Sequence, residues 1–169
     1  MQILAVAGRR GAGKTTLINE IARLVVDGNY GLPRVLTFEV TPDATVGDGL
    51  EHVQAELEKA VWDDAVMLEN GHPRGELVVL VDDVCYLEEV VMLRRWQATL
   101  LFLDADRRLK DVSETWRTVG PNQLSEDYTN GEYPETLFDW HVTNYHELVQ
   151  FKVEIALMKD YWIGGMIEA

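Results

Sequence analysis

The stretch Gly8-Arg9-Arg10-Gly11-Ala12-Gly13-Lys14-Thr15 decides the fold of this chain of 169 residues. It fits the pattern G-x-x-x-x-G-K-[ST] at every fixed position. The glycines let successive backbone N–H groups point at phosphate oxygens, and the start of a helix adds a favourable dipole. In this pattern Lys14 reaches the β and γ phosphates, and Thr15 offers a hydroxyl to Mg²⁺. The motif predicts a site for a nucleoside triphosphate, with ATP and Mg²⁺ as the expected cofactors.

The segments on both sides of the motif agree with this prediction. Residues 3–7 are a short apolar run of the kind that forms a buried parallel strand, and residues 14–26 carry apolar side chains at helical spacing. A glycine-rich turn without a ligand would not require this strand–loop–helix context. We therefore expect the nucleotide to be bound by Gly8, Arg10, Gly11, Ala12, Gly13, Lys14, Thr15 and Thr16.

Strand and helix patterns alternate along the rest of the chain. Further strands are expected at residues 34–40, 77–81, 99–103 and 138–142, and further helices at 49–68, 86–96 and 145–162. Five strands separated by helices predict an α/β fold, a three-layer α/β/α arrangement around a mostly parallel five-stranded sheet. With the phosphate loop, this is the fold of P-loop NTPases, and the length suits a single domain over residues 1–169.

The charge balance restricts the partners of the protein. Fifteen Lys and Arg residues face 29 Asp and Glu residues, which gives a net charge of −14 and a pI near 4.6. A chain this acidic argues against extended nucleic-acid binding and against binding to anionic lipid. Positive charge gathers instead near the phosphate loop and at residues 107–117. Any phosphate binding is therefore expected to be local.

The chain carries no sequence sign of secretion or of a membrane. Its one cysteine, Cys85, excludes an internal disulfide framework and fits a reducing compartment. Residues 1–8 lack a basic region and a long apolar region, and no stretch approaches the roughly 18 apolar residues that span a bilayer. We expect a cytoplasmic protein with no membrane partner.

A pair of acids follows the apolar run at residues 77–81. Asp82 and Asp83 stand where P-loop proteins hold an acid that binds or orders Mg²⁺, either directly or through water. Thr15, Asp82 and Asp83 are therefore the expected metal ligands. An alternative is that the aspartates only end the strand, with Asp83 capping the helix that begins near Tyr86.

Cations and one further acid complete the expected catalytic set. Residues 107–133 look irregular and polar, as a lid would, and their cations are Arg107, Arg108, Lys110 and Arg117. A lid can bring such cations over the transferred phosphoryl group, and Arg107 lies nearest the strand end. Glu39 ends the second strand and is a candidate to orient or deprotonate an acceptor hydroxyl. For each of these residues, a solvated surface charge is the alternative.

Most of the five tryptophans are expected in the core. We expect core positions for Trp96, Trp140 and Trp162, and packing in the core or a loop for Trp62 and Trp116. Trp116 could instead stack on a base. The four histidines show no metal-ligand spacing.

Three further segments resemble the phage-type deoxynucleoside monophosphate kinases. They are Val81-Asp82-Asp83-Val84-Cys85-Tyr86-Leu87-Glu88-Glu89, Val112-Ser113-Glu114 and Phe138-Asp139-Trp140-His141-Val142-Thr143-Asn144. Together with the phosphate loop they span most of the chain in order. The resemblance implies a nucleotide kinase-like P-loop fold and transfer of phosphate from ATP to a deoxynucleotide. It also aligns Asp83 with the acid of that family.

The sequence departs from the family at the position expected near the substrate phosphate. Cys85 stands where the family has arginine. Two interpretations remain open: the acceptor differs, or Arg94 or Arg95 takes the place of that arginine. We expect the acceptor site within residues 39–74, where no family motif matches.

The resulting hypothesis is an ATP- and Mg²⁺-dependent kinase of (deoxy)nucleoside monophosphates or of a related small nucleotide acceptor. One alternative is a kinase that acts on a modified base within DNA. Another is a P-loop ATPase or nucleotide-gated regulator whose partner binds residues 107–133. The sequence leaves three questions open: which acceptor is phosphorylated, whether ATP or GTP is the phosphate donor, and whether the protein forms a homodimer.

Overall fold

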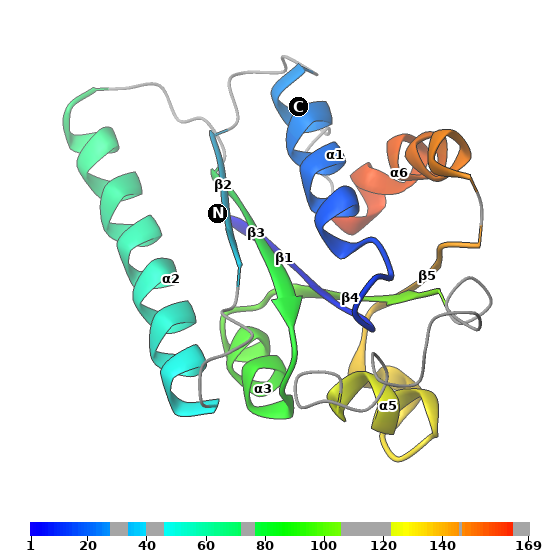
Figure 1. Ribbon diagram of the computed structural model, residues 1–169. Coiled ribbons are helices and arrows are strands. Elements are labelled where there is room, and N and C mark those ends of the chain that lie inside the picture. The colour runs from blue at the N-terminus through cyan, green and yellow to red at the C-terminus, as the bar shows by residue number, and fades with distance from the viewer. Residues whose placement is uncertain (28–33, 40–45, 72–76, 106–122, 146, 164–169) are drawn as a thin grey trace.

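The computed structural model describes residues 1–27, 34–39, 46–71, 77–105, 123–145 and 147–163, arranged as Figure 1 shows. The described strands form one sheet in which all pairs are parallel, in the order β2-β3-β1-β4-β5. They are β1 (Gln2–Ala7), β2 (Arg34–Glu39), β3 (Leu77–Val84), β4 (Thr99–Asp104) and β5 (Trp140–Thr143). The predicted parallel α/β fold is confirmed.

Helices cover both faces of this sheet (Figure 1). One face carries α1 (Lys14–Asp27) and α6 (Leu148–Trp162), and the other carries α2 (Val46–Glu69) and α3 (Leu87–Arg95). The short helix α5 (Gln123–Thr129) packs on the same face as α3, followed by a 3-10 helix, Glu135–Leu137. The arrangement is the expected three-layer α/β/α fold.

The central strand β1 connects the two halves of the core. Successive side chains of a strand point to opposite faces, and both faces of β1 are buried. Ile3, Ala5 and Ala7 join the cluster with α2 and α3, whereas Leu4 and Val6 join the cluster with α1 and α6. This double burial explains the continuous apolar run that precedes the phosphate loop. It also fixes the point in space where that loop begins.

Strand β3 is longer than predicted. The apolar run suggested an end near residue 81, but the strand continues to Val84, with an irregular register against β1 at the two aspartates. Asp82 is opposite Glu39 of β2, and Val84 is opposite Ala7 of β1. The backbone ladder with two neighbouring strands extends the strand past the point where its side chains become polar. Asp82 and Asp83 therefore belong to the last residues of β3 and do not lie in a loop after it.

The segment 107–133 was predicted to be irregular, but part of it forms a helix. Residues 123–129 form α5, and residues 106–122 lie outside the described part of the chain. Leu124 and Tyr128, four positions apart, are buried against β4 and stabilise this helix. The helix spans only seven residues, so its periodicity is too short to stand out in the sequence.

The last strand and helix are shifted from their predicted bounds. β5 begins at Trp140 and not at residue 138, and α6 begins at Leu148 and not at residue 145. Asn144 and Tyr145 are instead held against β4 and the phosphate loop, and the backbone N–H of Asn144 donates to the backbone oxygen of Asp104 at 2.7 Å. Asn144 donates to the backbone oxygen of Ala12 at 2.6 Å, and the Tyr145 hydroxyl donates to Asp104 at 2.6 Å.

The tryptophan predictions had mixed outcomes. Trp162 is fully buried, and Trp96 and Trp140 are half-buried against the two core clusters. The prediction for Trp62 was wrong, since this side chain is 70% exposed on the outer face of α2. The buried stripe of α2 is formed by Val53, Leu57 and Ala60, and Trp62 points away from it. Trp116 lies outside the described residues. Within the described residues, no helix is both long enough and apolar enough to cross a membrane.

Candidate functional site

The phosphate loop leaves the carboxyl end of β1 and leads into α1. Gly8 has a φ of +148°, and Gly11 and Gly13 also have positive φ. A Cβ atom on Gly8 would lie 2.5 Å from the backbone oxygen of Leu103 in β4. Both backbone conformation and space therefore require glycine at this position. The loop is pressed against the sheet edge, and its later residues turn towards solvent, where Arg10 and Thr15 are exposed.

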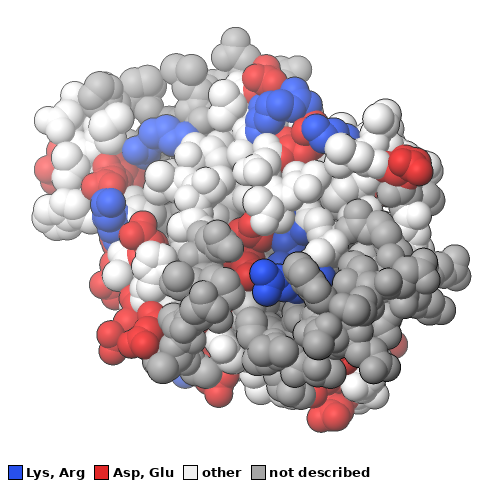
Figure 2. Space-filling view, in the orientation of Figure 1, with Lys and Arg blue, Asp and Glu red and all other residues white. Residues whose placement is uncertain are grey.

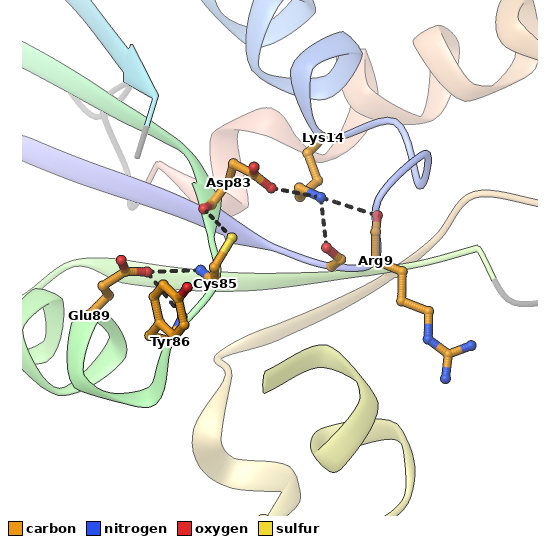
Figure 3. A network of polar contacts seen from close by, with 7 residues as sticks. Arg9, Lys14, Asp83, Cys85, Tyr86 and Glu89 are labelled. Carbon is orange, nitrogen blue, oxygen red and sulfur yellow. Dashed lines mark hydrogen bonds and ion pairs between the residues drawn. The ribbon is translucent and has the colours of Figure 1, made fainter. Parts of the chain in front are cut away.

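The ammonium group of Lys14 joins the loop to β3 (Figure 3). It donates to the backbone oxygens of Gly8 at 2.7 Å and Arg9 at 3.1 Å, and it lies 2.9 Å from the Oδ1 atom of Asp83. A lysine has three N–H donors, so these contacts engage all of them. The side chain is buried. Lys14 and Asp83, distant in sequence, are thus brought together beside the phosphate loop.

Asp83 adopts an unusual backbone conformation. Its φ is +64°, in the left-handed region that residues with a Cβ rarely adopt. The Cys85 thiol donates to its backbone oxygen at 3.0 Å, and Lys14 pairs with its carboxylate. Such a conformation persists only where neighbouring contacts determine it. The bend aims the Asp83 carboxylate at the phosphate loop.

Glu89 supports the turn that follows Asp83 (Figure 3). Its Oε2 atom accepts hydrogen bonds from the backbone N–H groups of Cys85 at 2.8 Å and Tyr86 at 3.1 Å. The start of α3 is therefore capped by Glu89, and the predicted alternative that Asp83 caps this helix was wrong. Glu89 is fully buried, and burial raises the pKa of its carboxyl group. Burial likewise raises the pKa of the Cys85 thiol.

Two contacts of the phosphate loop were missed by the sequence predictions. Arg9 forms an ion pair with Glu126 of α5, with its Nε atom 3.2 Å from Oε1. The buried Asn144, at the end of β5, donates to the backbone oxygen of Ala12. Asn144 is the last residue of the third family-like segment, so the resemblance marked it without giving it a role. Glu126 had no signal in the sequence, because its contact depends on the position of α5.

The remaining predicted residues are placed as follows. Asp82 is buried beside Asp83, and Thr16 is half-buried in the first turn of α1. The backbone of Glu39 ends β2 opposite Asp82, at the same sheet edge, and nothing is described of its side chain. The predicted lid cations lie outside the described residues; they are Arg107, Arg108, Lys110 and Arg117.

The residues at the loop fit a magnesium ion in their chemistry. Thr15 offers a hydroxyl oxygen, and Asp82 and Asp83 offer carboxylate oxygens, the hard donors that Mg²⁺ prefers. Among the described residues, no group of three or more His, Cys, Asp or Glu side chains forms a cage for a metal.

Charges of both signs lie on the face of the molecule that Figure 2 shows. Basic and acidic atoms lie together near the centre of this face, and further basic and acidic atoms lie around its margin. The chain as a whole carries −14. The acidic balance of the whole chain thus leaves basic groups at the centre of this face and elsewhere on it.

A groove lies between α2 and α3, next to this edge of the sheet. Its volume is about 520 Å³, within the range of small-molecule sites. Its walls combine apolar and charged side chains: Leu50, Glu51, Gln54, Leu87, Glu88, Val91, Met92 and Arg95. Leu87 and Glu88 start α3 only a few residues after Asp83. The groove lies partly within residues 39–74, where the acceptor site was expected.

The two arginines of α3 differ in their contacts. Arg94 donates to both carboxylate oxygens of Asp139 at 2.7 Å and to the backbone oxygen of Leu137. Arg95 lines the groove. Cys85 is buried and bonded to Asp83, so it cannot reach a ligand in the groove. Of the two replacements considered for the family arginine, Arg95 is the one at the groove.

Comparisons with known proteins reveal the fold. No family model matches the sequence, and no curated protein matches it. A crystal structure of the protein APE1195 superimposes with a TM-score of 0.56 and 16% identity, covering 96% of each chain. An unliganded sugar kinase from Janibacter sp. HTCC2649 superimposes with a TM-score of 0.50 and 16% identity, covering 100% of this chain and 99% of the other. The chain thus shares its overall α/β fold with these two solved structures, one of which is a sugar kinase.

Proposed function

We propose that this protein is an ATP- and Mg²⁺-dependent phosphotransferase that acts on a small acceptor in the cytoplasm. The observation that carries the proposal is the contact between Lys14 and Asp83 at 2.9 Å. It joins a complete phosphate-loop motif to the acid at the end of a neighbouring parallel strand. A glycine-rich turn without a ligand needs neither the lysine nor the acid.

Each residue of this edge has a role in the proposal. The backbone N–H groups from Gly8 to Thr15 bind the triphosphate, and Lys14 moves from the loop carbonyls to the β and γ phosphates. Thr15 and Asp83, with Asp82, are the residues that would hold Mg²⁺. When bound, the ion neutralises charge that develops on the phosphates. Arg107 and Arg108 are proposed to stabilise the transferred group, and Glu39 to orient the acceptor hydroxyl.

The groove between α2 and α3 is the proposed acceptor site. Its volume of about 520 Å³ suits a nucleotide, and Arg95 supplies one cation for an acceptor phosphate. This supports the deoxynucleoside monophosphate acceptor that the sequence resemblance implies. Apolar side chains such as Leu50 and Met92 offer a surface for a base.

A neutral hydroxyl acceptor, such as a sugar or another polyol, is the second candidate. Among the residues that the structure describes, the groove is lined by two carboxylates, on Glu51 and Glu88, and one cation, Arg95. This balance disfavours a dianionic phosphate and suits hydroxyl groups, which donate hydrogen bonds to carboxylates. The buried Cys85 in place of an arginine points the same way.

A phosphate-transfer assay separates these candidates. The full-length protein is incubated with Mg²⁺-ATP and either nucleoside monophosphates or neutral sugars and polyols. Transfer to a monophosphate that Arg95→Ala weakens by raising KM supports the first candidate. Transfer to a neutral acceptor with an unchanged KM in Arg95→Ala supports the second. Lys59→Ala, which removes an exposed cation elsewhere on α2, is the matched control.

The same assay tests the other classes of function. ATP hydrolysis with no acceptor phosphorylated in either group contradicts the proposal and favours an ATPase or a nucleotide-gated regulator. Phosphate transfer to DNA that carries a modified base, with none to free nucleotides or polyols, favours the DNA-directed kinase. In that case binding to DNA should weaken steeply with salt.

A further inference from the structure

The outer face of α6 carries an exposed apolar ridge. Val149, Val153, Leu157 and Tyr161 are spaced four residues apart and are 76%, 55%, 70% and 66% exposed. Residues at this spacing form one row along a helix surface. The opposite side of α6 is buried in the core through Phe151, Ile155 and Trp162. A helix that is apolar on both sides is typical of a buried element.

Next to this ridge lies a second row of side chains, with a small residue at its centre and a charged residue at each end. It consists of Lys152, Ala156 and Asp160, all exposed. Lys152 reaches Glu20 at 3.3 Å and Asp160 contacts Lys159, yet both side chains remain nearly half-exposed. The small Ala156 leaves a groove beside Val153 and Leu157 that a ridge of another helix can fill.

We propose that α6 is the interface of a symmetric homodimer of this chain. Lys152 and Asp160 lie four residues on either side of Ala156. An antiparallel two-fold axis at Ala156 therefore brings Lys152 of each copy towards Asp160 of the other. Such a self-complementary arrangement is what a two-fold interface requires. The proposal is independent of the proposed function.

The charge distribution of the chain favours α6 as the place where two copies meet. Two molecules that each carry −14 repel one another over most of their surface. Helix α6 contains Lys152 and Lys159 against Glu154 and Asp160, so it has no net charge of its own. Two copies of this helix thus meet with little repulsion between them.

The ridge offers a continuous apolar surface to a second copy. Each of its four side chains is more than half exposed, and a specific interface has to bury about 1,000 Å² in total, so the contact has to cover the whole ridge and its neighbours. In the four-to-four packing of such ridges the helices cross at about −50°, so contacts concentrate at the centre. Val153 and Leu157 are then the central contacts, with Val149 and Tyr161 near the ends.

Sedimentation equilibrium of the full-length protein tests the interface. The wild type should be a dimer whose dissociation constant does not rise in high salt, because salt screens the repulsion between the two acidic chains. Val153→Glu and Leu157→Glu should each raise the dissociation constant by about tenfold or more. Val61→Glu, at an exposed valine of α2 on the opposite layer, adds the same charge and should leave the dimer intact.

Further variants test the geometry. Val153→Lys makes the net charge of the chain less negative and should still weaken the dimer, which separates loss of apolar contact from general repulsion. Asp160→Lys should weaken the dimer, and Lys152→Asp combined with Asp160→Lys should recover part of the loss. Thermal unfolding of each variant confirms that it is folded. A monomeric wild type at high concentration overturns the proposal, as does a dimer that Val61→Glu disrupts and Val153→Glu does not.

Discussion

The carboxyl ends of β1 and β3 lie side by side in the sheet, and both turn the chain through positive φ angles by different means. At the end of β1 the residues are glycines, with Gly8 at φ +148°. At the end of β3 the residue is Asp83, at φ +64°. Glycine makes the first bend accessible on its own, whereas the second depends on Lys14, Cys85 and Glu89. One bend is specified by residue type and the other by tertiary contacts.

The difference has a functional reason. A phosphate loop needs backbone N–H groups free of side chains, so glycine suits its position. The neighbouring strand must present a carboxylate, which glycine cannot supply. The protein therefore holds an aspartate in a strained conformation and stabilises it with surrounding bonds. Each prediction below changes one of the two bends.

The largest effect is expected from Gly8→Ala. The new Cβ atom would lie 2.5 Å from the Leu103 backbone oxygen, so the loop or β4 must shift. We expect a loss of about 3 kcal/mol or more in the free energy of unfolding, from backbone strain and overpacking together. Urea denaturation measures it.

Gly71→Ala is the matched control for this change. Gly71 also has a positive φ, +74°, but a Cβ atom there meets nothing within 4 Å. We expect a loss of about 1 kcal/mol from backbone strain alone. Equal losses in the two variants would contradict a special role for the contact between Gly8 and β4.

A smaller loss is expected from Glu89→Ala, which acts on the second bend. It leaves the N–H groups of Cys85 and Tyr86 without their acceptor, and Cys85 is buried. We expect a loss of about 2 kcal/mol in the free energy of unfolding. Glu89→Gln keeps an acceptor oxygen and should retain more stability than Glu89→Ala. If both variants are as stable as the wild type, the capping role is refuted.

The pH dependence of stability provides a second test of Glu89. Burial raises the pKa of this carboxyl group in the folded state, which favours its protonated form there. Its contribution to stability is therefore fully present below the ordinary value of 4.5 and is lost as the pH rises through the raised pKa. The free energy of unfolding of the wild type minus that of Glu89→Gln should fall as the pH rises over this range. A difference that rises with pH would show that the pKa is lowered instead.

The smallest effect on stability is expected from Asp83→Asn. Asparagine tolerates positive φ and keeps an acceptor oxygen, and Lys14 keeps its bonds to the Gly8 and Arg9 backbone oxygens, so the unfolding free energy should change by about 1 kcal/mol. Phosphate transfer should nevertheless fall by about 10²-fold, because a carboxylate proposed to hold Mg²⁺ is lost. Asp83→Ala should be less stable than Asp83→Asn. A fully active Asp83→Asn would show that this carboxylate takes no part in the reaction.

The sequence was sufficient for most of the fold because its signals are local. The apolar run before Gly8 and the spacing within residues 14–26 predicted β1, the loop and α1 from neighbouring residues alone. The strand–helix alternation predicted the parallel sheet. The short helix α5 was missed since two buried side chains, Leu124 and Tyr128, are too few to produce a periodic signal.

The residues of the site could be predicted only where the amino-acid type and a local motif indicate their role. The phosphate loop and the acid pair were found from their pattern, and Lys14 and Asp83 do meet. The contacts of Glu126 with Arg9 and of Asn144 with Ala12 join residues more than 110 positions apart. The role of Glu89 likewise depends on a turn whose conformation no single residue specifies. Such contacts follow from the packing of the whole chain.

The central claim is that the two bends together form a triphosphate site, and calorimetric titration with Mg²⁺-ATP tests it most directly. The wild type should bind, and Lys14→Met should weaken binding by about tenfold to a hundredfold, since it removes a charge-assisted contact to phosphate. Lys59→Met, which removes an exposed lysine of α2, should bind as the wild type does. Equal affinity in Lys14→Met and the wild type, or no binding by the wild type, would contradict the account.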